Sequence, residues 1–132
     1  MTVYALDTNT LIYFFRDQGK VARNLLKVAP ARIAIPAIVL FELETGIAKS
    51  SEPDKRMKQL AELLDVVRVL PFDPKAARES ARIRAYLEAR GESIGPMDTL
   101  IAGTALAEGA TLVTRNAGEF GRVPGLRTVN WF

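Results

Sequence analysis

Apolar and polar positions follow two kinds of block along the chain. Short blocks of consecutive apolar residues, at 3–6, 33–35 and 111–114, have the length and composition of buried strands. Between them lie longer blocks in which apolar residues recur every three or four positions, which is the spacing of one helix face. Strands that alternate with helices favour a parallel sheet covered on both faces. The predicted fold is therefore α/β, a three-layer α/β/α sandwich with a central parallel sheet.

The boundaries of the expected elements come from capping residues and breakers. Thr8 is expected to cap the first helix, and Pro36 and Pro96 suit the first turns of theirs. In chain order we expect a strand at 3–6, a helix after Thr8, a helix at 19–28, a strand at 33–35, a helix from 36 to about 49, a hydrophilic loop at 49–56, a helix at 57–64, a strand at 66–70, a helix from 76 to 91, a helix at 96–108, a strand at 111–114 and an edge strand near 127–129.

Composition limits the chemistry that this chain can perform. Its 132 residues are 48% hydrophobic, which predicts a single domain over residues 1–132 with a substantial core. The absence of cysteine excludes disulfides and thiolate zinc sites, and it suits a reducing cytosol. The absence of histidine removes the usual general base and the commonest transition-metal ligand. Any metal must be held by oxygen ligands, which favours Mg²⁺ or Mn²⁺.

Charge and hydropathy add two expectations. The net charge of +3 is a mild basic excess that suits a polyanionic partner without identifying one. The longest strongly apolar run, at 33–41, is too short to span a bilayer, and the first residues lack the features of a signal peptide. We therefore expect a cytoplasmic protein with no membrane partner.

A single carboxylate interrupts the apolar N-terminal stretch VYALDTNTLIYFF. Asp7 follows the strand at 3–6, and apolar residues resume at Leu11. A charge in apolar surroundings costs several kcal/mol, of order 3 or more, unless something pairs with it. In open α/β sheets, chemistry gathers at the carboxyl ends of strands. Asp7 is therefore a candidate site residue.

Three further acids share this unusual setting. Glu42 lies within the helical segment AIVLFELETG among apolar neighbours, and Asp98 lies in the first turn of an apolar helix. Glu119 follows the strand at 111–114. Carboxylates brought this close repel one another unless a cation collects them. Three of the four acids have a simpler explanation as well: a helix cap for Asp7, a helix dipole for Asp98 and solvation for Glu119. Capping does not apply to Glu42, which lies in the middle of its helix.

Four segments together carry a family resemblance. LDTNTLIYF, the Glu of LFELETGIAKS, GPMDTLIAGTA and TLVTRNAGEF, in this order and spacing, resemble the PIN-domain ribonucleases, in particular the VapC toxins of toxin–antitoxin pairs. The ending FGRVPGLRTVNW resembles VapC members that cut initiator tRNA. The resemblance implies a Mg²⁺- or Mn²⁺-dependent endoribonuclease whose acidic centre is Asp7, Glu42 and Asp98. It also implies a homodimer or higher oligomer and inhibition by a cognate VapB-type antitoxin.

The fourth acid is the point where this sequence departs from the family pattern. Many PIN domains carry Asp where this chain has Asn116 or Glu119. Glu119 keeps the charge, so we predict that it completes the metal site, with Asn116 binding a phosphate oxygen or water. By resemblance, polar neighbours would orient the carboxylates, or alternatively act only as caps. These neighbours are Thr8, Asn9, Thr99 and, with Asn116, Thr114.

Basic residues near this predicted site are candidates for holding RNA. Arg115 adjoins the acidic loop and is a phosphate-binding candidate by position. Four others recur at helical spacing and could track a phosphate backbone, although such stripes are often only a solvated face. They are Arg16, Lys20, Arg23 and Lys27.

Three other classes of protein remain as alternatives. A haloacid-dehalogenase-type phosphatase needs a second acid two residues after Asp7, where this chain has Asn9. A receiver domain needs a Lys after its last strand, where this chain has Arg115. A degenerate PIN fold that only binds RNA would lack some of the acids, and all of them are present. The ribonuclease hypothesis fits the residues best.

Overall fold

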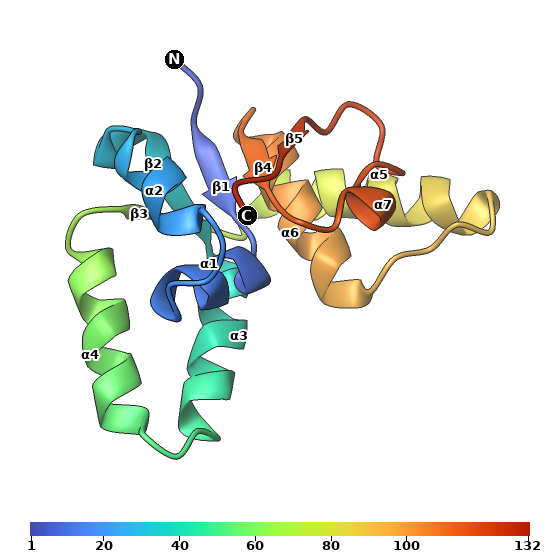
Figure 1. The fold of residues 1–132 in the computed structure, drawn as a ribbon. Coiled ribbons are helices and arrows are strands. Elements are labelled where there is room, and N and C mark those ends of the chain that lie inside the picture. Colours follow the sequence, from blue (N-terminus) through green and yellow to red (C-terminus); the bar gives the residue numbers. More distant parts are fainter.

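The computed structural model describes residues 1–132 and contains one five-stranded parallel sheet (Figure 1). Every neighbouring pair of strands is parallel, and their order across the sheet is β3-β2-β1-β4-β5. The strands are β1 (Tyr4–Leu6), β2 (Ile33–Pro36), β3 (Arg68–Leu70), β4 (Thr111–Val113) and β5 (Thr128–Val129). The predicted parallel α/β sheet is confirmed.

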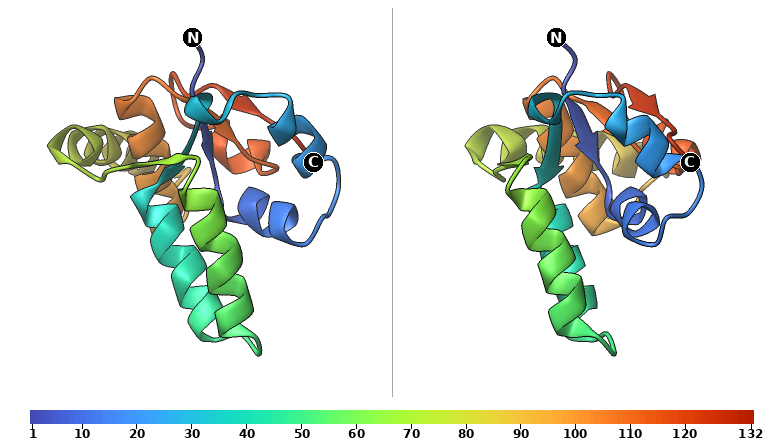
Figure 2. Two further views of the ribbon diagram at one scale, coloured as in Figure 1. Left: turned by 90° about the vertical axis from the view of Figure 1, so that its left-hand side faces the viewer. Right: turned by 60° about the vertical axis from the view of Figure 1, so that its left-hand side comes forward.

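Helices cover both faces of this sheet. They are α1 (Thr8–Phe15), α2 (Val21–Leu26), the 3-10 helix η1 (Pro30–Arg32), α3 (Ala37–Ala48), α4 (Pro53–Leu64), α5 (Pro74–Ala89), α6 (Pro96–Ala107) and α7 (Ala117–Phe120). Helices α5 and α6 lie on one side of the sheet and α1 and α2 on the other, while α3 and α4 form a hairpin that projects beyond the sheet (Figure 2). No helix combines the length and apolar character needed to cross a bilayer.

The central strand β1 and its neighbour β4 lie in the middle of the core. Ala5 and Leu6 of β1 and Leu112 and Val113 of β4 are fully buried. Residues without polar side chains can lie on both faces of these strands because helices cover both faces. The chain places its unbroken apolar runs in the central strands for this reason.

The topology also fixes the place where side chains from different strands converge. The chain moves from β1 to β2 and β3 on one side, then crosses back to place β4 on the other side of β1. The carboxyl ends of β1 and β4 therefore lie at the switch point of the sheet, where α/β folds form their sites. The Asp7 amide donates to the Val113 carbonyl (3.1 Å), and the Thr10 hydroxyl donates to the same oxygen (3.1 Å). These bonds hold the two strand ends together.

Several element boundaries differ from the expected ones. Helix α4 begins at Pro53, inside the segment expected to be a loop, because Pro is compatible with the first helical turn. Helix α2 is shorter than expected, and α7 was not predicted. The cap of α1 is Asp7 and not Thr8, since the Asp7 side chain accepts the Thr10 amide hydrogen.

Candidate functional site

Asp7 lies at the carboxyl end of β1 and is 6% exposed. Its Oδ1 accepts a hydrogen bond from the Thr10 amide (2.9 Å), which makes it the N-cap of α1. No protein group donates to its other carboxylate oxygen. The capping role proposed as the simpler explanation is therefore real, but it occupies only half of a buried carboxylate.

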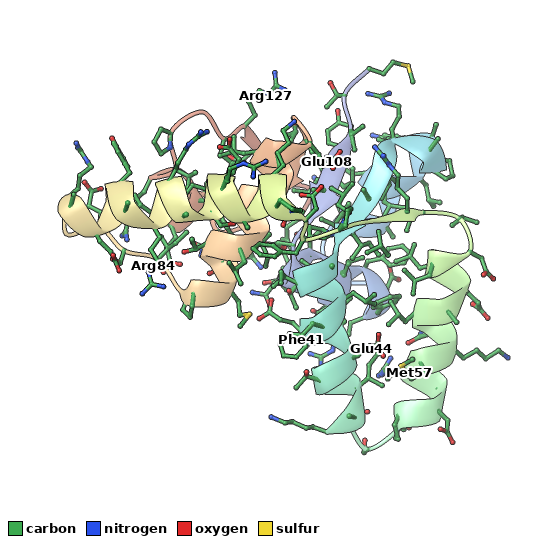
Figure 3. The ribbon with its side chains drawn as sticks, turned by 180° about the vertical axis from the view of Figure 1, so that it is seen from behind. Phe41, Glu44, Met57, Arg84, Glu108 and Arg127 are labelled. Atoms are coloured by element: carbon green, nitrogen blue, oxygen red, sulfur yellow. The ribbon has the colours of Figure 1, made fainter.

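Glu42 extends from α3 toward the start of α1. The Thr8 hydroxyl donates a 2.6 Å hydrogen bond to Glu42 Oε1, so Thr8 orients this carboxylate and does not cap the helix. Glu42 is half-buried, whereas Glu44, two residues further along, is exposed on the projecting hairpin (Figure 3). The fold thus turns one acid of α3 toward Asp7 and leaves the other in solvent.

Asp98 lies in the first turn of α6 and is half-buried. Burial, and after it the negative charges of Glu119, Glu42 and Asp7, together raise the pKa of Asp98 from 3.8 to about 6. A carboxylate feels such repulsion only from charges that are close. Four acids that are far apart in the sequence therefore share one region at the carboxyl edge of the sheet.

Glu119 reaches this region from α7. The Asn116 Nδ2 donates to Glu119 Oε2 (3.2 Å), and Asn116 Oδ1 accepts from the Glu119 amide (3.4 Å). The Asn116 amide in turn donates to Thr114 Oγ1 (2.9 Å), and Thr114 is buried at the end of β4. The Asn116 side chain thus both donates to and accepts from Glu119, and in this arrangement it orients the Glu119 carboxylate.

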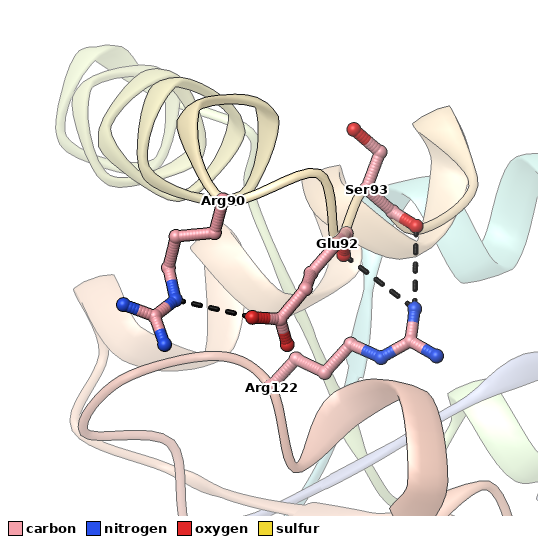
Figure 4. Close-up of polar contacts among 4 residues, drawn as sticks. All are labelled: Arg90, Glu92, Ser93 and Arg122. Carbon is pink, nitrogen blue, oxygen red and sulfur yellow. Dashed lines mark hydrogen bonds and ion pairs between the residues drawn. The ribbon is translucent and has the colours of Figure 1, made fainter.

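A second set of bonds ties α7 to the segment before α6. Arg122 Nη1 donates to the carbonyl oxygens of Ser93 (3.4 Å) and Glu92 (3.5 Å), as Figure 4 shows. Glu92 also accepts a hydrogen bond from Arg90 (3.1 Å). Because Asp98 follows this segment and Glu119 precedes Arg122, these bonds fix the two parts of the chain that carry those acids relative to each other.

The four carboxylates suit a hard cation. All donors are oxygens, the preferred ligands of Mg²⁺ and Mn²⁺. Burial is the largest cause of the raised pKa of Asp98, and a cation would relieve the smaller contribution that comes from the other three charges. In the side-chain arrangement seen here, no three acids converge as a set that could hold one ion. Three of them instead bond to neighbours: Asp7 to Thr10, Glu42 to Thr8 and Glu119 to Asn116. Binding a cation therefore requires some of these carboxylates to turn away from their present partners.

The other polar residues predicted around the acids occupy different environments. Thr99 is buried, and its hydroxyl donates to the Gly95 carbonyl (3.0 Å) within the first turn of α6. Asn9 is exposed and makes no side-chain hydrogen bond. Thr99 thus stabilises the turn that carries Asp98, whereas the structure gives Asn9 no orienting partner.

The predicted basic stripe is not a single helical face. Arg16 ends α1 and Lys20 precedes α2, so only Arg23 and Lys27 lie on or directly after α2. The helical spacing was misleading because Asp17 and Gly19 adopt positive φ angles and separate the two helices. Arg115 is exposed and lies over the Phe132 ring.

Sequence reasoning did not find three residues that shape this region. Tyr13 and Phe132 contact Arg115, and Arg122 braces α7. The sequence indicated only their common neighbourhood, because the segment TRNAGEF predicted the loop in which Arg115 lies. Nothing in the pattern brings residue 132 next to residue 13.

An acidic cluster at the switch point of a five-stranded parallel sheet defines the class of protein. Residues 4–126 match the PIN domain family, and the chain is a PIN domain protein. It is 35% identical to the tRNA(fMet)-specific endonuclease VapC of Salmonella typhimurium, with 99% of each chain covered. Together these matches show that the chain belongs to the VapC ribonuclease toxins.

Solved structures agree with this assignment. The fold superposes with a TM-score of 0.92 on a chain of VapBC2 from Rickettsia felis bound to a promoter DNA fragment, at 36% identity, covering 99% of this chain and 100% of that one. A chain of FitAcB from Neisseria gonorrhoeae gives a TM-score of 0.84 at 30% identity, covering 97% of both. The phosphatase and receiver alternatives are therefore set aside.

Replacing Asp98 by Asn should stabilise the protein in chelator at neutral pH. The substitution keeps the shape and removes one of four repelling charges, so we expect a gain of about 1 to 2 kcal/mol in unfolding free energy, limited by the remaining solvation of the side chain. The folded-state pKa is raised, so the cost of the charge grows as pH rises from about 4 to 6. Urea unfolding at pH 7 and pH 4 should show the gain only at pH 7.

The matched control for this variant is Asp54→Asn. Asp54 lies in the first turn of α4 but is exposed to solvent. Its loss should lower stability slightly, by about 0.3 to 1 kcal/mol, because only a favourable helix-dipole interaction is removed. If Asp98→Asn behaved like this control at pH 7, Asp98 would be an ordinary first-turn acid.

Proposed function

We propose that this chain is a metal-dependent endoribonuclease toxin that hydrolyses phosphodiester bonds through Asp7, Glu42, Asp98 and Glu119. The observation that carries the proposal is that β1, α3, α6 and α7 each bring one acid to the carboxyl edge of the sheet, where burial and the charges of the other three acids raise the pKa of Asp98. The histidine-free composition supports it, because the site must then work with carboxylates and a bound ion. Residues 1–132 would form a single PIN domain.

The four acids would hold Mg²⁺ or Mn²⁺. When bound, such an ion lowers the pKa of water and offsets negative charge on the reacting phosphate. Thr8 and Asn116 set the orientations of Glu42 and Glu119 through the hydrogen bonds already in place. Asp7, after β1, and Asp98, on α6, would hold the ion, and Glu119 would orient a second ion or the attacking water from α7.

The proposed substrate is tRNA, cut in the anticodon region of the initiator tRNA. The name of the 35% identical Salmonella relative supports this choice of substrate. The net charge of +3 and the exposed Arg115 beside the acidic loop fit a polyanionic ligand. Arg16, Lys20 and Arg23 are exposed and would contact the RNA from separate segments, not as one stripe.

The proposed regulator is a cognate VapB-type antitoxin. Two of the similar solved structures, VapBC2 of Rickettsia felis and FitAcB of Neisseria gonorrhoeae, carry names that pair two components, which supports a partner protein for this chain. We also propose that the chain acts in the cytoplasm as a homodimer or higher oligomer.

Incubation of the purified protein with total tRNA tests the substrate assignment. With Mg²⁺ present we expect initiator tRNA to be cut within its anticodon region and other tRNAs to remain intact, and excess chelator should stop the reaction. Mapping the new ends by primer extension identifies the bond. Uniform cleavage of all tRNAs would refute the initiator assignment while leaving the ribonuclease assignment in place, and cleavage that persists in chelator would refute the metal.

A further inference from the structure

Beside the acidic region, the Arg115 guanidinium lies over a pair of aromatic rings. The Arg115 guanidinium carbon is 3.6 Å from the centroid of the Phe132 ring and 5.7 Å from that of Tyr13. The two rings meet edge to face, with centroids 4.9 Å apart and planes at 74°. Three segments far apart in the sequence thus build one small surface: the end of α1, the loop after β4 and the residues after β5.

The aromatic base of this surface is held firmly. The Phe132 carbonyl accepts a hydrogen bond from the Lys20 amide, and its own amide donates to Asn130 Oδ1 (2.9 Å). Gly19 packs directly on the ring with φ of +63°, and a Cβ there would come within 2.8 Å of the ring atoms. The position of the ring is therefore set by backbone contacts, and Arg115 is oriented by the ring.

Arg115 has no other partner. Arg82, Arg84 and Arg90 each pair with a glutamate, but the Arg115 side chain makes no hydrogen bond and no ion pair. Its guanidinium carbon lies over the Phe132 ring, and the residue is exposed. A planar cation that is held against a ring and remains open to solvent is available to bind a ligand.

The location of this surface relates it to the proposed reaction. Arg115 lies between Thr114, which bonds to the Asn116 amide, and Asn116, which holds Glu119. A nucleotide bound at Arg115 would therefore neighbour the phosphate that the acids act on. Unpaired RNA bases are commonly held by stacking on aromatic rings or on arginine planes.

We propose that Arg115, backed by Phe132 and Tyr13, is a stacking platform for an unpaired base next to the cleaved bond. This inference rests on the proposed ribonuclease function and goes further by assigning a base-binding subsite. A contact to phosphate alone would need only a positive charge, which lysine could supply equally well. It would need neither a planar group nor an aromatic ring beneath it. The ring beneath Arg115 therefore favours stacking over a simple charge contact.

Equilibrium binding of two oligonucleotides tests the platform. In the Asp7→Asn background with Mg²⁺, a 12-nucleotide oligoadenylate should bind about 10-fold more tightly than an abasic strand of the same length, because stacking adds to the backbone contacts. Arg115→Lys keeps the charge and removes the planar face. In this variant the ratio of the two affinities should fall close to one, while the affinity for the abasic strand should stay unchanged.

A second variant and a matched control complete the experiment. Phe132→Leu removes the ring beneath Arg115 and should also reduce the ratio of the two affinities. Tyr86→Leu is the matched control and should leave this ratio unchanged. The Arg90 guanidinium carbon lies 5.2 Å from the centroid of the Tyr86 ring, but this pair belongs to the end of helix α5, away from Arg115. An unchanged ratio in Arg115→Lys, or an equal loss for both strands, would overturn the platform and leave the ribonuclease assignment intact. No preference for bases in the Asp7→Asn background would also overturn the platform. Cleavage of tRNA by the parent chain tests the ribonuclease function separately.

Discussion

Asp7→Asn is expected to abolish RNA cleavage, lowering kcat by about 10³-fold or more. Asp7 is buried at the end of β1 and is the acid most deeply enclosed in the site. Asn is also a good N-cap, so the hydrogen bond from the Thr10 amide can be kept and α1 should form normally. The substitution therefore separates the two explanations of Asp7, since it removes the charge and preserves the cap. Cleavage of labelled tRNA under single-turnover conditions measures the loss.

Asp73→Asn provides the matched control for this variant. Asp73 caps α5 through the same type of bond, from the Ala76 amide to Oδ1 at 2.9 Å, but it follows the edge strand β3. We expect its activity to stay within about twofold of the parent, since surface substitutions away from a site have little effect. Equal activity losses in the two variants, or an active Asp7→Asn protein, would show that Asp7 is only a cap.

Gly103→Ala is expected to destabilise the fold by about 3 kcal/mol or more, even though Ala is the better helix former. Helices α5 and α6 approach closely at this point. A Cβ on Gly103 would overlap the Ser80 hydroxyl and would lie 2.7 Å from the Ser80 backbone nitrogen and 2.8 Å from its Cα. Two of these atoms belong to the backbone, so the helices themselves must separate. Urea unfolding measures the change.

Gly46→Ala is the opposite case in the same fold. Gly46 lies inside α3 with no atom within 4 Å of the position of an added Cβ. Replacement should stabilise the protein by about 0.5 to 1 kcal/mol through backbone entropy and helix propensity. A Gly103→Ala protein as stable as the parent would mean that α5 and α6 can separate at little cost.

The features that sequence predicted well depend on burial. The runs at 3–6 and 111–114 became the strands β1 and β4, in which Ala5, Leu6, Leu112 and Val113 are fully buried because both faces of the sheet are covered. Because Asp7 follows such a run, the sequence predicted that it lies at the carboxyl edge of the sheet. Asp98 lies in the same region because it belongs to the first turn of α6, which begins after Gly95. Strong periodicity and an isolated charge are properties of the chain itself, and they persist in the fold.

The features that sequence missed depend on contacts between distant segments. From its local sequence Thr8 was predicted to be the N-cap of α1. In the structure its hydroxyl donates a hydrogen bond to Glu42 on α3, and Asp7 is the N-cap. Helix α7 has four residues, too few to show a period, and it exists because Asn116 caps it. The support of Arg115 by Phe132 joins residues that no local pattern relates.

The most direct measurement is the anomalous diffraction of crystals grown with Mn²⁺. We expect a peak bounded by the carboxylates of Asp7 and Asp98, with Glu42 or Glu119 turned toward it, and no such peak in crystals of Asp7→Asn. A parent protein that cleaves RNA in Mn²⁺ but shows its manganese away from these four acids would contradict the assignment of the acidic cluster as the metal centre.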